Sequence, residues 1–282
     1  MPVYDTVAIV GVGLIGGSVG LALRERELAG EVVGIGRSPA SLARAEQRGA
    51  VDRSTIHLAE GVAGADVVVV ASPVSRVVEH LVAAAEAAGT TQLVTDAAST
   101  KGQVCSEVDR QLAGKNAPFV GSHPLAGSHL TGVDAANPDL FENKLVVITP
   151  TPETAEVAPI EAEAFWMRLG ARVRHMTPED HDRALAATSH LPHLVASALA
   201  GATEHDDLPL TASGWADTTR VAAADPALWT DIFLQNRPAV RQALAAFQVR
   251  LDELAAALEA GEHQRIEAQL RHAKGIRDAV GD

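Results

Sequence analysis

A glycine-rich turn near the start of the chain has the residue types and spacing to hold a pyrophosphate. The turn follows an apolar run at residues 6–10 and contains Gly11, Gly13, Leu14, Ile15 and Gly16. Its first glycine permits the tight turn, its second lets the backbone approach the phosphates, and its third allows close packing. The helix after it offers free N–H groups to the negative charge. The alternative is a packing turn in an α/β protein without a nucleotide, but a strand before and an amphipathic helix after favour a dinucleotide.

The end of the second apolar run indicates which dinucleotide is bound. An acid about 20 residues after the turn binds the ribose 2′-hydroxyl in NAD proteins. Here Gly36 occupies that position and is followed by Arg37 and Ser38. A guanidinium and a hydroxyl suit a 2′-phosphate, so we expect NADP rather than NAD. Arg37 stacked on the adenine would serve either cofactor. Ser72 and Pro73 end a later run, where the nicotinamide should lie.

Two further polar segments follow apolar runs. Residues 96–101 come directly after the run at 92–95 and include Ser99, which either faces the cofactor or caps the next helix; both roles are compatible. Residues 121–129 form a Gly/Pro-rich loop that contains His123 and Ser128. A single histidine is commonly structural, but one at a strand end opposite the glycine turn is placed to act as a general base.

The remaining polar clusters lie in the second part of the chain. Residues 189–193 place His190 and His193 on either side of Pro192, which should kink a helix. A metal site built from His123 and these two histidines is not expected, because no cysteine or acid lies at ligand spacing. Residues 214–220 include Asp217 and Arg220, and 225–226 and Trp229 follow. Arg220 taken alone is equally compatible with a solvated helix residue.

The elements that must position these residues divide into two groups. Up to about residue 178, apolar runs alternate with helical stretches, which is typical of a doubly wound α/β fold with a parallel sheet covered on both faces. The expected strands lie at 6–10, 31–35, 66–71, 92–95, 119–120, 145–149 and 173–176, and the expected helices at 18–27, 39–48 and 75–88. We therefore expect a Rossmann-type dinucleotide-binding domain over residues 1–178.

Residues 179–282 are expected to form an all-α domain for substrate binding and dimerisation. Thr177 can cap its first helix, and the strand pattern disappears after it. The expected helices cover 181–204, 228–259 and 264–279. The apolar stripe of the second helix is larger than one small helical domain can bury, so we expect a homodimer through these helices.

Composition narrows the class of protein further. A formal charge of −13 argues against nucleic-acid binding, and the single cysteine, Cys105, excludes an internal disulfide and suits a reducing compartment. The N-terminus has no signal-peptide pattern, and no apolar run is long enough to cross a bilayer. We expect a soluble cytoplasmic protein that acts on a small molecule and has no membrane partner.

Taken together, these motifs resemble the prephenate/arogenate (cyclohexadienyl) dehydrogenase family of tyrosine biosynthesis. The resemblance covers nearly the whole chain and rests on residues 11–18, 96–101, 122–127, 189–193 and 217–220, with 225–226 and Trp229. It implies a Rossmann domain followed by an α-helical dimerisation domain, with the active site between them. It also implies an oxidative decarboxylation, in which a hydride leaves ring C4 for NAD or NADP and the ring carboxylate leaves as CO₂.

The resemblance also implies roles for individual residues. His123 would take the proton of the C4 hydroxyl, with Ser99 hydrogen-bonded nearby to orient it. Arg220 would hold a substrate carboxylate, and Asp217 would fix a cation near it. His190 and His193 would line the pocket from the helical side, with Trp229 packed at its wall.

Two departures from the family pattern bear on specificity. Gly36 replaces the acid that many members carry, which leaves the choice between NAD and NADP open. The loop at residues 128–131 has no carboxylate to pair with the amino group of arogenate, which favours prephenate.

Three alternatives remain at this stage. A relative acting on 4-amino-4-deoxyprephenate, or on another cyclohexadiene acid, would share all of these motifs. A β-hydroxyacid dehydrogenase or imine reductase would need a lysine or an acid in the helix that begins at His181, which has no lysine. A cofactor-sensing protein without activity would not need Ser99, His123 and Arg220 together.

Overall fold

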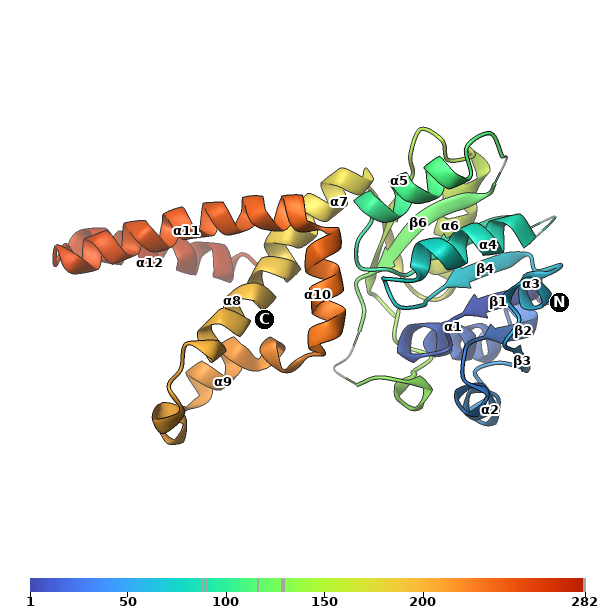
Figure 1. Cartoon of the computed structure of the whole chain (residues 1–282), viewed down its shortest axis with the longest axis horizontal. Coiled ribbons are helices and arrows are strands. Elements are labelled where there is room, and N and C mark those ends of the chain that lie inside the picture. The colour runs from blue at the N-terminus through green and yellow to red at the C-terminus, as the bar shows by residue number, and fades with distance from the viewer. Residues whose placement is uncertain (88, 90, 116, 128–129, 281–282) are drawn as a thin grey trace.

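The computed structural model describes residues 1–87, 89, 91–115, 117–127 and 130–280. Figure 1 shows two parts side by side: a sheet with helices on both faces, and a set of helices that extends away from it. This arrangement confirms the expected order of a Rossmann-type sheet followed by a helical region.

The sheet has eight strands in the order β3-β2-β1-β4-β5-β6-β7-β8. Its strands are β1 (Tyr4–Val10), β2 (Ala29–Ile35), β3 (Arg53–Thr55), β4 (Val67–Val70), β5 (Leu93–Asp96), β6 (Phe119–Pro124), β7 (Leu145–Thr149) and β8 (Arg172–His175). All neighbours are parallel except β6 and β7, which are antiparallel. In its described residues, the connection between these two contains a short 3-10 turn, η1 (Val133–Ala135), and no crossover helix that would return the chain to the starting edge.

Both faces of the sheet are buried, as the uninterrupted apolar runs predicted. Alternate residues of a strand enter different cores: Val7 and Ile9 belong to one, Ala8 and Val10 to the other. The covering helices are α1 (Leu14–Glu25), α2 (Pro39–Gln47), α3 (Leu58–Val62), α4 (Val77–Ala87), α5 (Gly102–Gln111) and α6 (Val157–Arg168).

The second part is helical but more broken than the sequence indicated. It contains α7 (Pro178–Leu185), a π-helical turn η2 (Ala186–His190), α8 (Leu191–Gly201), η3 (His205–Leu210), α9 (Ser213–Thr219), η4 (Arg220–Ala223), α10 (Pro226–Gln235), α11 (Arg237–Glu259) and α12 (His263–Asp278). As expected, the hydroxyl of Thr177 caps α7 by accepting a hydrogen bond from the backbone N–H of Asp180.

Two expected helices are interrupted, and each interruption has a local cause. The expected helix at 181–204 contains the π turn just before Pro192, and the one at 228–259 stops at Asn236 before Pro238. A proline has no N–H to continue the helix, and its ring crowds the carbonyl four residues earlier. Both interruptions fall in the part of the molecule that faces the sheet (Figure 1).

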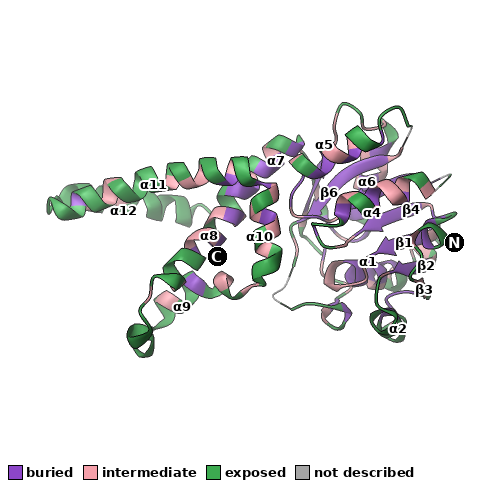
Figure 2. Ribbon diagram, viewed as in Figure 1, coloured by how far each residue is buried: buried purple, intermediate pink, exposed green. Residues whose placement is uncertain are grey.

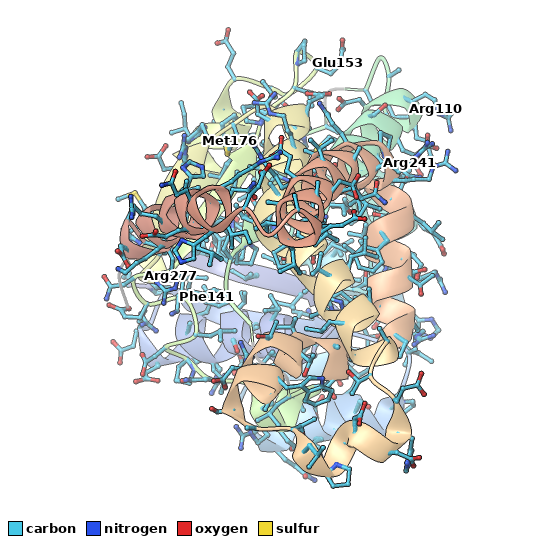
Figure 3. All side chains as sticks on the ribbon, turned by 90° about the vertical axis from the view of Figure 1, so that its left-hand side faces the viewer. Arg110, Phe141, Glu153, Met176, Arg241 and Arg277 are labelled. Carbon is cyan, nitrogen blue, oxygen red and sulfur yellow. The ribbon has the colours of Figure 1, made fainter. Side chains whose placement is uncertain are left out.

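Burial differs between the two parts. Figure 2 shows buried residues concentrated in the sheet, whereas α11 and α12 are mostly exposed. α12 has no buried residue at all. Seen along the long axis, α11 and α12 lie side by side, with Arg241 and Arg277 labelled (Figure 3). Within the described residues, no helix has the length and apolar character needed to cross a membrane.

Candidate active site

A cleft of about 480 Å³ lies at the carboxyl ends of β1, β2, β4 and β5. It is lined by Gly11, Val12, Gly13, Ile15, Gly36, Arg37, Ser38, Ser41, Leu42, Ala71, Ser72, Pro73, Val74, Ala97, Ala98, Ser99 and Leu228. The structure thus brings together most of the residues that the sequence predicted for the cofactor. Leu14 and Gly16 do not line the cleft, although Ile15 between them does.

The glycine turn has the shape that a pyrophosphate requires. Gly11 has a φ of +96°, and a Cβ on it would lie 2.6 Å from the carbonyl oxygen of Ala71. A Cβ on Gly16 would lie 2.1 Å from the carbonyl oxygen of Gly11, so neither position can carry a side chain. A Cβ on Gly13 would meet nothing within 4 Å, and no side chain caps α1 there. This open space in front of uncapped N–H groups fits a phosphate.

The other polar groups of the cleft are also compatible with a dinucleotide. Arg37 and Ser38 are exposed at its edge, and the hydroxyl of Ser38 accepts a 3.3 Å hydrogen bond from the backbone N–H of Ser41. The hydroxyl of Ser72 is buried without a hydrogen-bond partner within the described parts of the chain. An unpaired buried hydroxyl is costly, which suggests that Ser72 contacts a ligand.

His123 lies inside a strand rather than in the loop that the sequence indicated. β6 continues to Pro124 because β7 pairs with it, and His123 stands opposite Val147. Only 9% of His123 is exposed. The pairing fixes the backbone of His123 more firmly than a loop would.

A chain of hydrogen bonds connects His123 to the helical part. Nδ1 of His123 lies 2.8 Å from Nε2 of His181, and Nδ1 of His181 lies 2.8 Å from Oδ1 of Asp182. The Asp182 carboxylate accepts 2.8 Å hydrogen bonds from the backbone N–H groups of Lys101 and Gly102, at the start of α5. A Cβ on Gly102 would lie 2.9 Å from Oδ2 of Asp182, so this approach requires glycine.

These contacts determine which ring nitrogens of His123 and His181 carry a hydrogen. Burial raises the pKa of Asp182, but the hydrogen bonds from His181, Lys101 and Gly102 outweigh it, so the net pKa is lowered and the group is a carboxylate. Nδ1 of His181 must therefore donate to it, and in a neutral His181 Nε2 accepts from Nδ1 of His123. Nε2 of His123 is then unprotonated. Burial, followed by the nearby His181 and Lys101, holds the pKa of His123 well below its usual value.

His181 and Asp182 were not among the residues predicted from the sequence. The sequence showed only a histidine and an acid in the first turn of a helix, and only the packing of α7 against α5 gives them a function. Ser99, predicted to orient His123, makes no hydrogen bond to it and lines the cofactor cleft instead. The His181 ring occupies the position beside Nδ1 of His123.

Asp96 and Lys101 hold the sheet ends in place beneath His123. They form an ion pair whose side chains are fully buried. Oδ1 of Asp96 accepts from the backbone N–H of Ser122, and Nζ of Lys101 donates to the carbonyl oxygen of Ser122 at 2.9 Å. Because both charges are paired and hydrogen-bonded, they stabilise the strand position next to His123.

His190 and His193 form a second cluster with Trp229. The ring of His193 stacks on Trp229 with centroids 3.6 Å apart, and His190 meets Trp229 edge-on at 6.1 Å. The π turn η2 lies between His181 and His193, and the residue that it adds to one turn changes the relative direction of these two side chains by about 100°.

Asn236 links Asp182 to His190 within the helical part, and Gln235 links the helical part to the sheet part. Nδ2 of Asn236 donates to the carbonyl oxygen of Asp182 at 2.8 Å and lies 3.1 Å from Nδ1 of His190. Gln235 donates to the carbonyl oxygen of Val74 at 2.9 Å and accepts from the hydroxyl of Thr100 at 2.5 Å. α10 therefore lies over the cofactor cleft, which Leu228 also lines.

The other predicted substrate residues are not part of these clusters. Arg220 on η4 and Asp217 on α9 are exposed, and neither side chain makes a hydrogen bond or an ion pair with another described residue. η4 packs against α8, which carries His193. Ser128 lies outside the described residues.

Comparison with known proteins gives a consistent result over the whole chain. Residues 19–175 match the model "Prephenate dehydrogenase, nucleotide-binding domain", and residues 177–272 match "Prephenate dehydrogenase, dimerization domain". A prephenate dehydrogenase of Bacillus subtilis is 32% identical, with 98% of this chain and 76% of that protein covered.

Two solved structures are similar over nearly their full length. One is prephenate dehydrogenase from A. aeolicus in complex with hydroxyphenyl propionate and NAD⁺, with a TM-score of 0.90, 31% identity and 98% of each chain covered. The other is Synechocystis arogenate dehydrogenase, with a TM-score of 0.83, 29% identity, and 98% of this chain and 99% of that chain covered.

Proposed function

The chain belongs to the prephenate dehydrogenase family, and on this premise we propose that it converts prephenate to 4-hydroxyphenylpyruvate and CO₂ while reducing NADP. The family reaction is an oxidative decarboxylation of prephenate or arogenate coupled to reduction of a pyridine nucleotide. The observation that carries the proposal is the hydrogen-bonded series His123–His181–Asp182, which leaves Nε2 of the buried His123 unprotonated, in a ring that lies near His190.

His123 acts as the base in this proposal. Its Nε2 accepts the proton of the C4 hydroxyl while the hydride leaves C4, and the hydroxyl becomes a ring carbonyl. The C1 carboxylate then leaves as CO₂, and its bonding electrons make the ring aromatic. The resulting phenolate recovers the proton from His123, so no net proton is released. A positioned base contributes about 10²–10⁴-fold to such a reaction.

The Asp182 charge supports this proton transfer from a distance. When His123 receives a proton, the imidazolium donates through Nδ1 to His181, and His181 donates to the Asp182 carboxylate. A buried carboxylate that orients a histidine and stabilises its protonated form serves the same purpose in the serine-protease triad. His181 and Asp182 are therefore positioning residues rather than groups that touch substrate.

The substrate site of the proposal is built from the second cluster and its neighbours. His190 and His193 line it, Trp229 forms its wall, and Arg220 supplies the cation for a substrate carboxylate. Asp217 and Ser128 complete the set predicted from the sequence. The exposed guanidinium of Arg220, which pairs with no described residue, is consistent with a binding role.

The cofactor is a pyridine nucleotide, and we assign the finer preference to NADP. The space in front of Gly13 and the unpaired Ser72 hydroxyl fit the diphosphate and nicotinamide ends. Arg37 and Ser38 at the end of β2 fit a 2′-phosphate, where Gly36 places no opposing charge. When bound, the nicotinamide ring accepts the hydride.

The division of labour follows the two expected domains, residues 1–178 for the cofactor and residues 179–282 for substrate binding and dimerisation. The matched dimerization model and the exposed Leu210, Leu258 and Ile276 of the helical part support a homodimer. The same proposal includes a cytoplasmic location, which the single buried thiol of Cys105 supports.

One assay tests the proposal. Purified enzyme is given prephenate or L-arogenate, each with NAD or NADP, and reduced cofactor is followed by absorbance while released CO₂ is captured. We expect the largest kcat/KM for prephenate with NADP and one CO₂ per reduced cofactor. Absence of reduced cofactor in all four combinations would contradict the proposed function. A preference for arogenate or for NAD would correct only the finer assignment.

A further inference from the structure

Asn236 joins α10 to α11 and is only 3% exposed. Its position fixes the orientation of its amide group. The carbonyl oxygen of Asp182 can only accept a hydrogen bond, so the atom that faces it at 2.8 Å must be the NH₂ group. The same nitrogen lies 3.1 Å from Nδ1 of His190.

This contact determines which nitrogen of His190 carries the proton. An amide NH₂ can only donate, so Nδ1 of His190 must accept, and a neutral imidazole then carries its hydrogen on Nε2. Burial lowers the pKa of His190 to about 4, so the ring is neutral at physiological pH. Nε2 has no hydrogen-bond partner within the described chain, and only 1% of His190 is exposed, so this nitrogen is nearly closed off from solvent.

The two histidines closest to the reaction therefore have opposite hydrogen-bonding roles. His123 presents an unprotonated Nε2, because Asp182 and His181 use its Nδ1 hydrogen. His190 presents an Nε2–H, because Asn236 uses its Nδ1 lone pair. The ring of His190 is near enough to His123 for its charge to contribute to the lowered pKa of His123.

We propose that Asn236 is a positioning residue that holds His190 as a hydrogen-bond donor toward an oxygen of the substrate side chain. The identity of that oxygen rests on the proposed function: the oxo acid side chain of prephenate offers only acceptors. The ammonium group of arogenate, which only donates, finds no acceptor at this nitrogen. Asn236 thereby favours the oxo acid over the amino acid, although it does not touch the substrate.

The inference can be tested without any activity. In ¹⁵N-histidine-labelled enzyme, long-range ¹H–¹⁵N NMR correlations identify the protonated nitrogen of each neutral ring. We expect Nε2–H for His190 and Nδ1–H for His123, with the two signals assigned from His190→Gln and His123→Asn. A wild-type spectrum with Nδ1–H on His190 overturns the proposal. If these tautomers are found but prephenate is not oxidised, only the proposed function fails.

Asn236→Asp adds a kinetic test. A carboxylate at this position raises the pKa of His190, on which Asp182, His181 and His193 also act. Below the new pKa the imidazolium still donates through Nε2, so KM for prephenate stays close to that of the wild type. Above it, Nδ1 keeps the hydrogen and Nε2 becomes an acceptor, so we expect KM to rise 10- to 100-fold with pH. The wild-type KM should not change over this range, because its His190 stays neutral. The carboxylate also loses the hydrogen bond to the carbonyl oxygen of Asp182, which adds a loss that is independent of pH. A loss without any pH-dependent part would indicate a merely structural role and would contradict the proposal.

Gln235→Glu is the matched control, because Gln235 is next to Asn236 in the sequence but contacts Val74 and Thr100 rather than His190. It should raise KM for the cofactor and leave the His190 nitrogen signals unchanged. A change of the His190 tautomer in this variant would show that Asn236 does not control it specifically.

Discussion

The two parts of the molecule build their functional geometry by different means. In the sheet part, the cofactor cleft is formed by backbone: glycines without room for a Cβ, and strand ends set by parallel pairing. In the helical part, the site depends on side chains that hydrogen-bond to distant segments, such as Asp182 to the start of α5 and Asn236 to Asp182 and His190, and on a π turn. The comparison teaches that the base is placed by one part and oriented by the other.

The two parts also differ in how much of their apolar surface is buried. The sheet has an apolar core on each face, whereas Leu210, Leu258 and Val280 of the helical part are 82%, 72% and 79% exposed. Residues 177–272 of this part match a dimerization domain, and exposed apolar residues mark an interaction site where they gather into one patch. The helical part is thus the element that a second subunit would complete.

The largest expected effect comes from removing the base. His123→Asn should lower kcat by about 10²–10⁴-fold, because no other group takes the hydroxyl proton. Cofactor affinity, measured by quenching of protein fluorescence, should stay within about twofold, since His123 does not line the cofactor cleft. Turnover near the wild-type rate would show that the base lies elsewhere.

The next effect concerns the stability of the folded protein at low pH. The folded-state pKa values of His123 and His190 are below the value of about 6.5 for an unfolded histidine, so unfolding takes up protons as the pH falls below 6.5. Stability contributed by these neutral rings is complete above pH 6.5 and is lost as the pH falls toward the folded pKa, about 4 for His190. Urea unfolding should show about 2–3 kcal/mol less acid destabilisation between pH 6.5 and 4 in His190→Gln. An unchanged pH dependence in that variant would contradict the assignment.

A smaller effect is expected from a residue far from the substrate. Gly102→Ala places a Cβ 2.9 Å from Oδ2 of Asp182 and should displace the carboxylate. We expect kcat to fall about 10- to 100-fold with little change in KM, as the orientation of His123 loosens. The matched control is Gly275→Ala on α12, where a Cβ meets nothing within 4 Å. Equal kcat values in the two variants would show that the position of the Asp182 carboxylate does not affect catalysis.

The smallest effect concerns the cofactor part alone. Gly36→Asp places an acid at the end of β2, where the atoms nearest to a Cβ belong to the flexible side chain of Leu42, the first at 3.1 Å. The ratio of kcat/KM for NADP to that for NAD should fall at least about 10-fold, since the carboxylate repels a 2′-phosphate and accepts from a 2′-hydroxyl. An unchanged ratio would remove the basis for assigning NADP.

The sequence was sufficient for what backbone chemistry determines. The glycine turn, seven of the eight strands, the Thr177 cap and the grouping of His190 and His193 near Trp229 follow from spacing, residue type or family motif. The short edge strand β3 was not predicted. The sequence predicted a strand at the position of β7 but not its antiparallel direction, because an apolar run looks the same in either direction. Without that pairing, the sequence could not show that His123 lies inside β6, where β7 holds it.

What the sequence could not indicate depends on contacts between distant segments. His181 and Asp182 become meaningful only when the start of α7 meets the start of α5. Asn236 resembles an ordinary helix end until its amide is seen between Asp182 and His190. Each is a side chain whose role is set by a partner more than 40 residues away, and local patterns contain no information about such pairs.

The central claim, that the helical part orients the base of the sheet part, is tested most directly by a double-mutant cycle of His123→Asn and Asp182→Asn. If Asp182 acts only through His123, the double variant should be no slower than His123→Asn alone, although Asp182→Asn by itself lowers kcat by about 10²–10⁴-fold. Strong non-additivity in kcat is the predicted result. Losses that multiply in the double variant would show that Asp182 acts independently of His123 and would contradict the account.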